Sequence, residues 1–313
     1  MASTLITVAD TTERDALSPA AGDTVYQIDN KKINVCASVD PVVWHSYDSD
    51  GVAVNDTDIT GLSPHLWLDP RYSSAFFADS GKGTPVTADG KRVGCFADRS
   101  GNGFDFVQSV EANKPTLCTE SGIGAVPSLV YSSTDQLEFV GDTNSEISAA
   151  NLTLFFVWRT STEGGQWSLQ GTSNFNEPRM RINNSGGGYV YQWWPFGSEE
   201  TSGTGGVLFS TTVMDADSFH GRHIYCLKTN SSANRTYTYH NGGSDIAGSA
   251  AAPTGVFLED AETFKVFQSS SGAYAPNWLF EFLVFESSLS DSDVNKVNSY
   301  LGAKHGIEVT DVS

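Results

Sequence analysis

Positive charge is scarce in this sequence of 313 residues. It contains 18 lysines and arginines but 37 aspartates and glutamates, and the formal net charge is −19. A surface this acidic repels phosphate backbones, so a nucleic-acid partner is not expected. Long apolar runs are also missing. None of them approaches the roughly 18 residues that cross a bilayer, so membrane insertion is not expected either.

Secretion and disulfide signals are missing as well. The first residues, Met1-Ala-Ser-Thr-Leu-Ile-Thr-Val, lack the basic start and apolar core of a secretory signal, so we expect synthesis in a cytoplasm without export. The cysteines are few and far apart, and no C-x-x-C pair occurs, which predicts neither a disulfide framework nor a zinc site. They are Cys36, Cys95, Cys118 and Cys226.

Motifs of common catalytic sites do not occur. Retaining β-glucanases carry E-x-D-x-E on one strand, where alternate positions share a face and two carboxyl groups lie about 5–5.5 Å apart. No E-x-D-x-E occurs here, and Glu281 and Glu286 are an odd number of residues apart, so on one strand they point to opposite faces. There is also no G-x-S-x-G and no H-E-x-x-H. We therefore expect a protein that is not an enzyme.

Short alternating strands at regular spacing fill the chain from residue 61 onward. The turns between them carry Gly-Gly, Asn-Gly or Asn-Asn, and 30 glycines occur in all. This pattern predicts an all-β fold, an antiparallel sandwich of two sheets in the jelly-roll style. The clearest strands are expected at 152–159, 166–170, 179–182, 188–194, 207–213, 222–228, 235–239, 264–268 and 278–286.

A single helix is predicted at the C-terminal end, after the last strand. Ser290 is a good N-cap, with Asp293 three residues later as a short capping-box partner. Leu289 before the cap and Val294 inside the helix can form a hydrophobic staple. Gly306 ends the helix as a left-handed cap.

The first 60 residues form a separate, small β-rich domain in this interpretation. Strands are expected at 24–28 and 32–35, with a turn between them, and a third at 42–47. The predicted domains are therefore 1–60 and 61–313.

Several motifs of the second domain resemble the laminin-G-like, concanavalin A-like lectin and glucanase family. The motifs are Leu-Trp-Leu-Asp at 66–69, Asp-Arg-Ser-Gly-Asn-Gly at 98–103, Leu-Ser-Asp at 289–291, and Tyr-Leu-Gly-Ala-Lys-His-Gly at 300–306. Phe96 stands where the family usually has Trp. The resemblance implies a concanavalin A-like jelly roll with one closing helix. The fold alone does not imply glucanase activity.

The first domain resembles a small module found at the N-termini of phage virion proteins. The match is the run E-R-D-A-L-x-P-x-x-G-D-x-V-Y at 13–26, followed by a strand pair and a strand with Trp44. It implies a virion structural protein, bound to other virion proteins through residues 1–60 and displayed on the particle surface as a homo-oligomer, for which we expect a trimer. Host attachment as a fibre or spike is the expected role. The alternatives are capsid decoration, as a head or head-fibre protein, and a free carbohydrate-binding or glycan-degrading protein.

An aromatic cluster at 189–196 is the predicted recognition site for a host cell-surface glycan. Sugars stack on exposed aromatic rings, here Tyr191, Trp193 or Trp194, while Gln192 and Asn183 can bond hydroxyl groups. Because side chains alternate along a strand, only one of the two tryptophans is expected at the surface. The alternative is that the cluster fills the core and an oligomer interface.

The turn at 98–103 is a candidate calcium site. Asp98, Ser100 and Asn102 place oxygen-bearing side chains at alternate positions before Gly103, like the opening half of a calcium loop, but the twelfth position holds Ser109 instead of glutamate. The alternative is a hairpin corner whose side chains bond local backbone groups. A second candidate, the pair at 220 and 223, has a spacing that puts two histidines on opposite faces of a strand, which favours a structural use.

Overall fold

The chain divides into two compact units, Met1–Gly61 and Leu62–Ser313. The computed structural model describes residues 5–8, 24–27, 32–39, 42–47, 56–72, 74–119, 126–131, 135–140, 147–148, 150–160, 166–170, 179–184, 189–194, 208–209, 221–243, 256–258, 263–266 and 277–312. None of the described helices is long and apolar enough to span a membrane.

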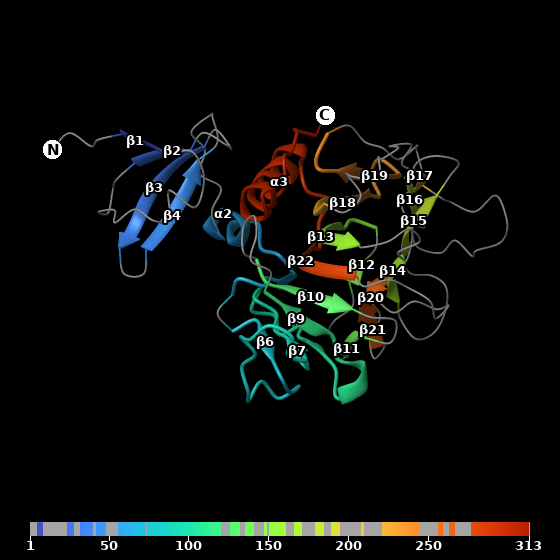
Figure 1. Cartoon of the computed structure of the whole chain (residues 1–313). Helices are drawn as coiled ribbons and strands as arrows, with labels where there is room; N and C mark the ends of the chain where they lie inside the picture. Colours follow the sequence, from blue (N-terminus) through green and yellow to red (C-terminus); the bar gives the residue numbers. More distant parts are fainter. Residues whose placement is uncertain are drawn as a thin grey trace. The chain divides into compact units, whose positions relative to one another are not determined.

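The first unit contains a four-stranded sheet in the order β1 (Leu5–Val8), β2 (Thr24–Gln27), β3 (Lys32–Val39) and β4 (Val42–Tyr47) (Figure 1). The hairpin of β2 and β3 and the following β4 are antiparallel, as alternation predicted. The sequence did not predict β1, which pairs with β2 in parallel. Helix α2 (Asp56–Gly61) follows the sheet.

The second unit holds two main sheets and a short strand pair. The seven-stranded sheet contains β5 (Leu66–Leu68), β9 (Thr116–Cys118), β10 (Ser128–Tyr131), β13 (Thr153–Thr160), β18 (His223–Asn230), β19 (Arg235–His240) and β22 (Asn277–Phe285). The nine-stranded sheet contains β6 (Phe76–Phe77), β7 (Cys95–Phe96), β8 (Phe106–Val107), β11 (Leu137–Val140), β14 (Gln166–Gln170), β15 (Arg179–Asn184), β16 (Tyr189–Trp194), β17 (Leu208–Phe209) and β21 (Thr263–Val266). The remaining elements are η1 (Glu111–Asn113), the pair β12 (Ile147–Ser148) and β20 (Val256–Leu258), and helix α3 (Asp291–His305).

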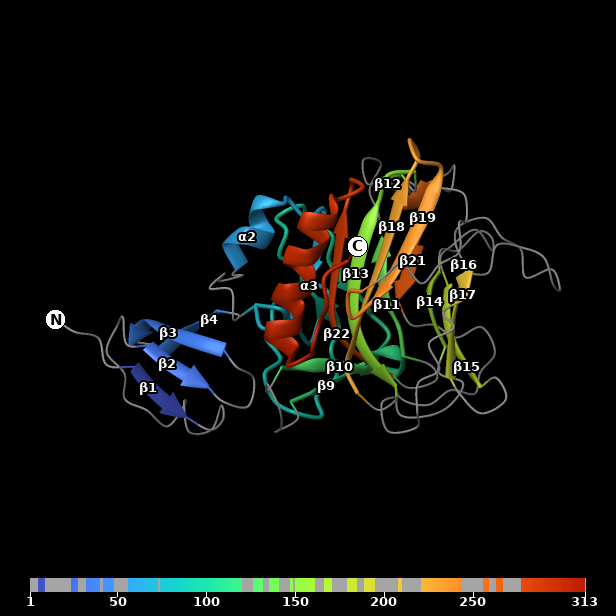
Figure 2. The ribbon, with the colours of Figure 1, turned by 90° about the horizontal axis from the view of Figure 1, so that it is seen from above.

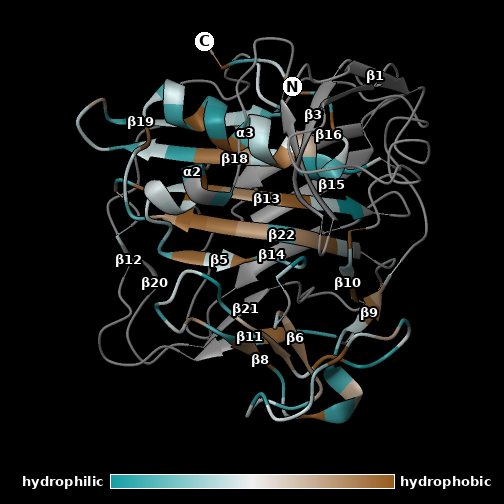
Figure 3. Ribbon diagram, turned by 90° about the vertical axis from the view of Figure 1, so that its left-hand side faces the viewer, coloured by the Kyte–Doolittle hydropathy of each residue, from teal (hydrophilic) through white to brown (hydrophobic). Residues whose placement is uncertain are grey.

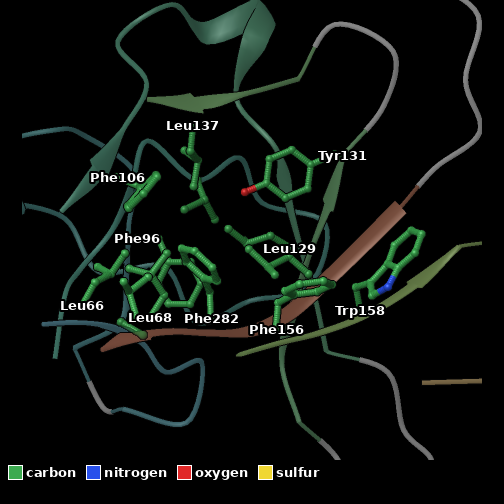
Figure 4. Packing of buried hydrophobic residues seen from close by; sticks show 14 of the residues in the cluster. Leu66, Leu68, Phe96, Phe106, Leu129, Tyr131, Leu137, Phe156, Trp158 and Phe282 are labelled. Atoms are coloured by element: carbon green, nitrogen blue, oxygen red, sulfur yellow. The ribbon is translucent and has the colours of Figure 1, made fainter. Parts of the chain in front are cut away.

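These elements form layers, with α3 on one face of the seven-stranded sheet and the nine-stranded sheet on its other side (Figure 2). The core lies between the two sheets and is rich in aromatic residues (Figure 4). Its members labelled there are Leu66, Leu68, Phe96, Phe106, Leu129, Tyr131, Leu137, Phe156, Trp158 and Phe282. The predicted fold class, an antiparallel two-sheet sandwich with one C-terminal helix after a small β-rich N-terminal unit, is confirmed.

Strand β22 is the central strand of the seven-stranded sheet. It pairs with β13 along one edge and with both β5 and β10 along the other. β13 and β22 run side by side and are largely hydrophobic (Figure 3). Such strands are buried on both faces, because the core covers one face and α3 the other.

A β-bulge in β22 changes which residues face α3. Glu281 lies opposite Val157, whereas Leu279 lies opposite Trp158, so Phe280 is the extra residue. Leu279 belongs to the core cluster between the sheets. Phe280 and Glu281 both face α3, where the Phe280 ring lies against His305 and Glu281 bonds the helix. Without the bulge, alternation would turn Glu281 to the same side as Leu279.

Both predicted caps of helix α3 are confirmed. Ser290 is the N-cap, and its Oγ accepts a hydrogen bond from the Asp293 amide at 3.2 Å. Gly306 is the C-cap, in the left-handed conformation with φ of 68°. Val294 and Leu301 are buried along the face toward the sheet.

Candidate functional site

The predicted recognition residues lie on two adjacent strands, β15 and β16. These strands pair antiparallel, with Asn183 opposite Val190 and Ile182 opposite Tyr191. The side chains of this strand pair lie outside the described part of the structure. The strand register is therefore used to find which positions share a face of the sheet. Positions directly opposite each other share a face of the sheet, and alternate positions along one strand do too.

The core side of this sheet can be followed from strand to strand. Leu137 of β11 is buried in the core cluster and lies opposite Val266 of β21. Val266 in turn lies opposite Leu169 of β14. Since Leu169 and Trp167 are alternate positions of β14, position 167 also falls on the core side.

Following cross-strand partners in the same way from β14 leads to the predicted recognition residues on β15 and β16. Trp167 lies opposite Met180 of β15, and Met180 lies opposite Trp193 of β16. Positions 191 and 193 therefore belong to the core side, and positions 192 and 194 belong to the outer side. The outer positions of the pair form what we call the outer strip, made of Arg179, Arg181, Asn183, Val190, Gln192 and Trp194.

The predicted set is thus divided between two faces. The positions of Asn183, Gln192 and Trp194 fall on the outer side of the sheet, and those of Tyr191 and Trp193 fall on the core side. Alternation along β16 predicted that only one tryptophan faces outward. The register with β15 adds which one it is, and it brings two arginine positions beside it.

Asp98, Ser100 and Asn102 form a tight turn. Asp98 Oδ1 accepts hydrogen bonds from the backbone amides of Trp67 and Ser100, each at 2.9 Å. Asp98 Oδ2 accepts from the Ser100 hydroxyl at 2.6 Å, and Asn102 Nδ2 donates to the carbonyl oxygen of His65 at 2.8 Å. This is the corner arrangement that the sequence offered as the alternative to calcium. Among the described residues, no group of three or more His, Cys, Asp or Glu could hold a metal ion, and the calcium site stays a prediction.

His223 is part of a buried aromatic group at the end of β18. Its Nδ1 lies 3.0 Å from Nε2 of His240, and the Tyr225 ring stacks on His240 with centroids 5.1 Å apart. Burial and, to a smaller extent, the neighbouring His223 lower the pKa of His240 to about 3. His220, the other half of the predicted pair, lies outside the described residues.

The sequence did not predict a cluster of charged groups buried beneath α3. Lys304 Nζ lies 2.6 Å from Asp69 Oδ1, 2.9 Å from Glu281 Oε1 and 2.8 Å from Tyr300 Oη. The side chains of Lys304, Asp69 and Glu281 are 5%, 1% and 0% exposed. One ammonium group is therefore shared by two carboxylates away from water.

Four further groups form hydrogen bonds with the two carboxylates. The Arg71 backbone amide donates to Asp69 Oδ1 at 2.9 Å. Arg99 Nη1 donates to Asp69 Oδ2. Trp67 Nε1 donates to Glu281 Oε1 at 2.8 Å, and His305 Nε2 lies 2.7 Å from Glu281 Oε2. Because a carboxylate only accepts, His305 Nε2 carries the proton. We call Asp69, Arg99, Glu281, Lys304 and His305 the buried charged cluster.

The pKa values of the two carboxyl groups in this cluster move apart. Burial, together with the charge of Glu281, raises the pKa of Asp69. Burial alone would also raise the pKa of Glu281, but Lys304 and the hydrogen bonds from His305 and Trp67 outweigh it and lower this pKa. Burial lowers the pKa of His305 to about 4, so the imidazole is neutral at neutral pH.

The two strand glutamates do not form a pair. Glu281 lies in the buried charged cluster, whereas Glu286 is half-exposed and its Oε2 lies 3.0 Å from His65 Nδ1. This separation agrees with the opposite faces expected from their spacing, and it provides no retaining-glycosidase pair.

One signal for the buried charged cluster was present in the helix pattern. Lys304 lies three residues after Leu301 and seven after Val297, so it continues the apolar face of α3. A charged residue on a buried face requires a partner, so this position could have indicated a buried ion pair. It does not identify the two partners, Asp69 and Glu281, which are 235 and 23 positions away.

Comparisons with known proteins agree with the fold. No protein-family model and no curated protein matches the sequence. The ligand-binding domain of botulinum neurotoxin serotype D, solved in complex with N-acetylneuraminic acid, is similar in structure, with a TM-score of 0.50 and 15% identity. That match covers 76% of this chain and 51% of the other. A further receptor-binding domain matches with a TM-score of 0.50 and 13% identity, over 79% of this chain and 53% of the other. This chain therefore spans about half the length of those domains, and the similarity concerns the fold.

Proposed function

We propose that this protein is a non-enzymatic, lectin-like protein on the surface of a phage particle, which binds a host cell-surface glycan through the outer strip. The observation that carries the binding role is the register of β15 and β16. It puts Trp194 on one outer face together with Gln192 and Asn183. An aromatic ring for the C–H face of a sugar and amides for its hydroxyl groups are the groups that such a site needs.

The two arginines of the outer strip suggest the class of glycan. Arg181 lies opposite Gln192, and Arg179 lies opposite Trp194. Guanidinium groups bind carboxylates in a bidentate manner, so an acidic sugar fits this face better than a neutral one. The neurotoxin domain of similar fold was solved with N-acetylneuraminic acid, and this makes sialylated glycans the first to test.

The test compares two neighbouring tryptophans on the full chain. Trp194→Ala should abolish binding to an array of acidic glycans and leave the melting temperature close to that of the parent. Trp193→Ala, the matched control, should lower the melting temperature because its position is on the core side. Unchanged binding by Trp194→Ala, or release of sugar products by the purified protein, would contradict the proposal.

The placement on a phage particle is supported by the resemblance of residues 13–26 to the virion module, which lies in the separate unit Met1–Gly61. In this proposal residues 1–60 bind other virion proteins, the sandwich faces outward, and the protein is a trimer. Electron microscopy of particles labelled with an antibody against the sandwich tests it. Label at the tail tip or on fibres supports host attachment, label over the whole head indicates decoration, and unlabelled particles contradict the placement.

A further inference from the structure

The buried charged cluster brings an amine and a carboxyl group into contact in a setting that water does not reach. Lys304 Nζ and Asp69 Oδ1 are 2.6 Å apart, and their side chains are 5% and 1% exposed. An ammonium and a carboxylate that are both buried carry a large desolvation cost. Transfer of one proton from Lys304 to Asp69 gives a neutral amine and a neutral acid, which a low-dielectric setting favours.

A second carboxyl group lies beside this pair. Glu281 Oε1 is 2.9 Å from Lys304 Nζ, and the Glu281 side chain is fully buried. Glu281 is held in place by Trp67 Nε1 at 2.8 Å and by His305 Nε2 at 2.7 Å. A fixed acceptor at this distance can take a proton from the amine and return it to a leaving oxygen.

Asp69 is also polarised from its other side. Arg99 Nη1 donates to Asp69 Oδ2, while Lys304 contacts Oδ1. If the amine attacks the carboxyl carbon, negative charge develops on the oxygen that remains. A guanidinium already bound to Oδ2 stabilises that charge without reorganisation.

From this arrangement we propose that Lys304 and Asp69 condense to an intramolecular amide bond, with Glu281 as the proton carrier. After one proton has passed from Lys304 to Asp69 Oδ1, the amine nitrogen attacks the Asp69 Cγ carbon. The N–Cγ bond forms and the Cγ–Oδ1 bond breaks. Glu281 moves the second proton from nitrogen to Oδ1, which leaves as water, and Oδ2 becomes the amide oxygen on Arg99. Nothing is oxidised or reduced, and no co-reactant is needed.

The bond would join the end of β5 to the end of α3, 235 positions apart. A cross-link over a loop this long restricts the unfolded chain strongly and raises resistance to unfolding. Its effect on stability is separate from glycan binding, and the inference does not depend on the proposed function.

Mass spectrometry of the denatured full chain tests the bond directly. The wild-type chain should be lighter than its sequence mass by one water, and digestion should yield one branched peptide that contains both Asp69 and Lys304. Pro70 follows Asp69 and has no amide N–H, so a cyclic imide at Asp69 does not explain the same mass loss.

Variants separate the roles of the groups. Glu281→Gln and Lys304→Arg should both have the full mass expected from their sequences, whereas Lys296→Arg, on the exposed side of α3, should keep the loss of water. A wild-type chain of full sequence mass, or a loss of water located elsewhere, overturns the proposal. The branched peptide of the wild-type chain decides the question even if Glu281→Gln does not fold.

Discussion

Trp67 Nε1 donates a hydrogen bond to Glu281 Oε1 at 2.8 Å, although the two residues are 214 positions apart. β5 and β22 pair directly, with Trp67 opposite Leu283, and the bulge at Phe280 turns Glu281 toward α3. The first strand of the sandwich, its last strand and its helix therefore meet at one buried carboxylate. The hydrogen bonds and ion pairs of Glu281 therefore connect the beginning and the end of the second unit.

Lys304→Met tests how much the buried charged cluster contributes to the free energy of unfolding. In a chain without the amide bond between Lys304 and Asp69, the change leaves Asp69 and Glu281 buried next to each other without their shared cation. Breaking a buried ion pair on one side costs about 3–5 kcal/mol. We expect a loss of this size in the free energy of unfolding, measured by urea denaturation.

Lys296→Met is the matched control. Lys296 is on the same helix, is 48% exposed, and pairs with Asp293 at 2.7 Å. Exposed pairs contribute less than about 1 kcal/mol. An equal loss in both variants would mean that the buried charged cluster has no special role.

Acid should destabilise the second unit because two histidines are buried in the neutral form. Burial lowers the pKa of His305 to about 4 and that of His240 to about 3, from 6.5 in both cases. The unfolded chain takes up protons below pH 6.5 that the folded chain does not. Stability is therefore complete above pH 6.5 and falls as the pH decreases toward 4, by roughly 3 kcal/mol from His305 alone.

Melting temperatures over this pH range measure the effect. His305→Gln keeps a donor for Glu281 but does not titrate, so the slope between pH 6.5 and 4 should become shallower. A slope identical to that of the parent would show that folding does not shift the pKa of His305.

Much of the fold could be predicted from the sequence because its signals are local. Alternation predicted the long strand that becomes β22, and the caps Ser290 and Gly306 bound α3. Each of these features depends on residues within a few positions of each other. The parallel pairing of β1 with β2 is not local in this sense and was missed.

The site could be predicted only in part, for the same reason. Alternation along β16 separated Trp193 from Trp194, but the outward face followed only from registers across β11, β21, β14 and β15. The buried charged cluster depends on a single extra residue, Phe280. Alternation without that bulge puts Glu281 on the wrong face.

Calcium is expected to leave the stability unchanged. Both oxygens of Asp98 already accept hydrogen bonds, from the amides of Trp67 and Ser100 on one side and from the amide of Phe104 at 3.1 Å on the other. Asp98→Ala removes these acceptors and should cost about 2–3 kcal/mol, whether or not a chelator is present. A rise in melting temperature with calcium that Asp98→Ala abolishes would instead establish the predicted metal site.

Ser290→Ala tests the cap of α3. Ser290 Oγ accepts from the Asp293 amide at 3.2 Å and donates to Asp293 Oδ2 at 2.7 Å. Loss of an N-cap costs about 1 kcal/mol. Ser292→Ala, at an exposed position of the first turn, is the control and should be neutral, since alanine favours helix. Equal stability of both variants in urea would mean that the capping bonds add nothing.

Charge should govern glycan binding if the outer strip is the site. Arg181→Gln removes a guanidinium from the face that carries Gln192 and Trp194 but keeps a polar side chain of similar length. We expect at least tenfold weaker binding to a sialylated glycan, which corresponds to about 1.4 kcal/mol, and unchanged binding to its neutral counterpart. Added salt should weaken the parent more than the variant, because it screens the lost interaction. Lys265→Gln, on β21 of the same sheet and away from the strip, is the control. If both variants bind alike, the arginines of the outer strip do not select acidic sugars.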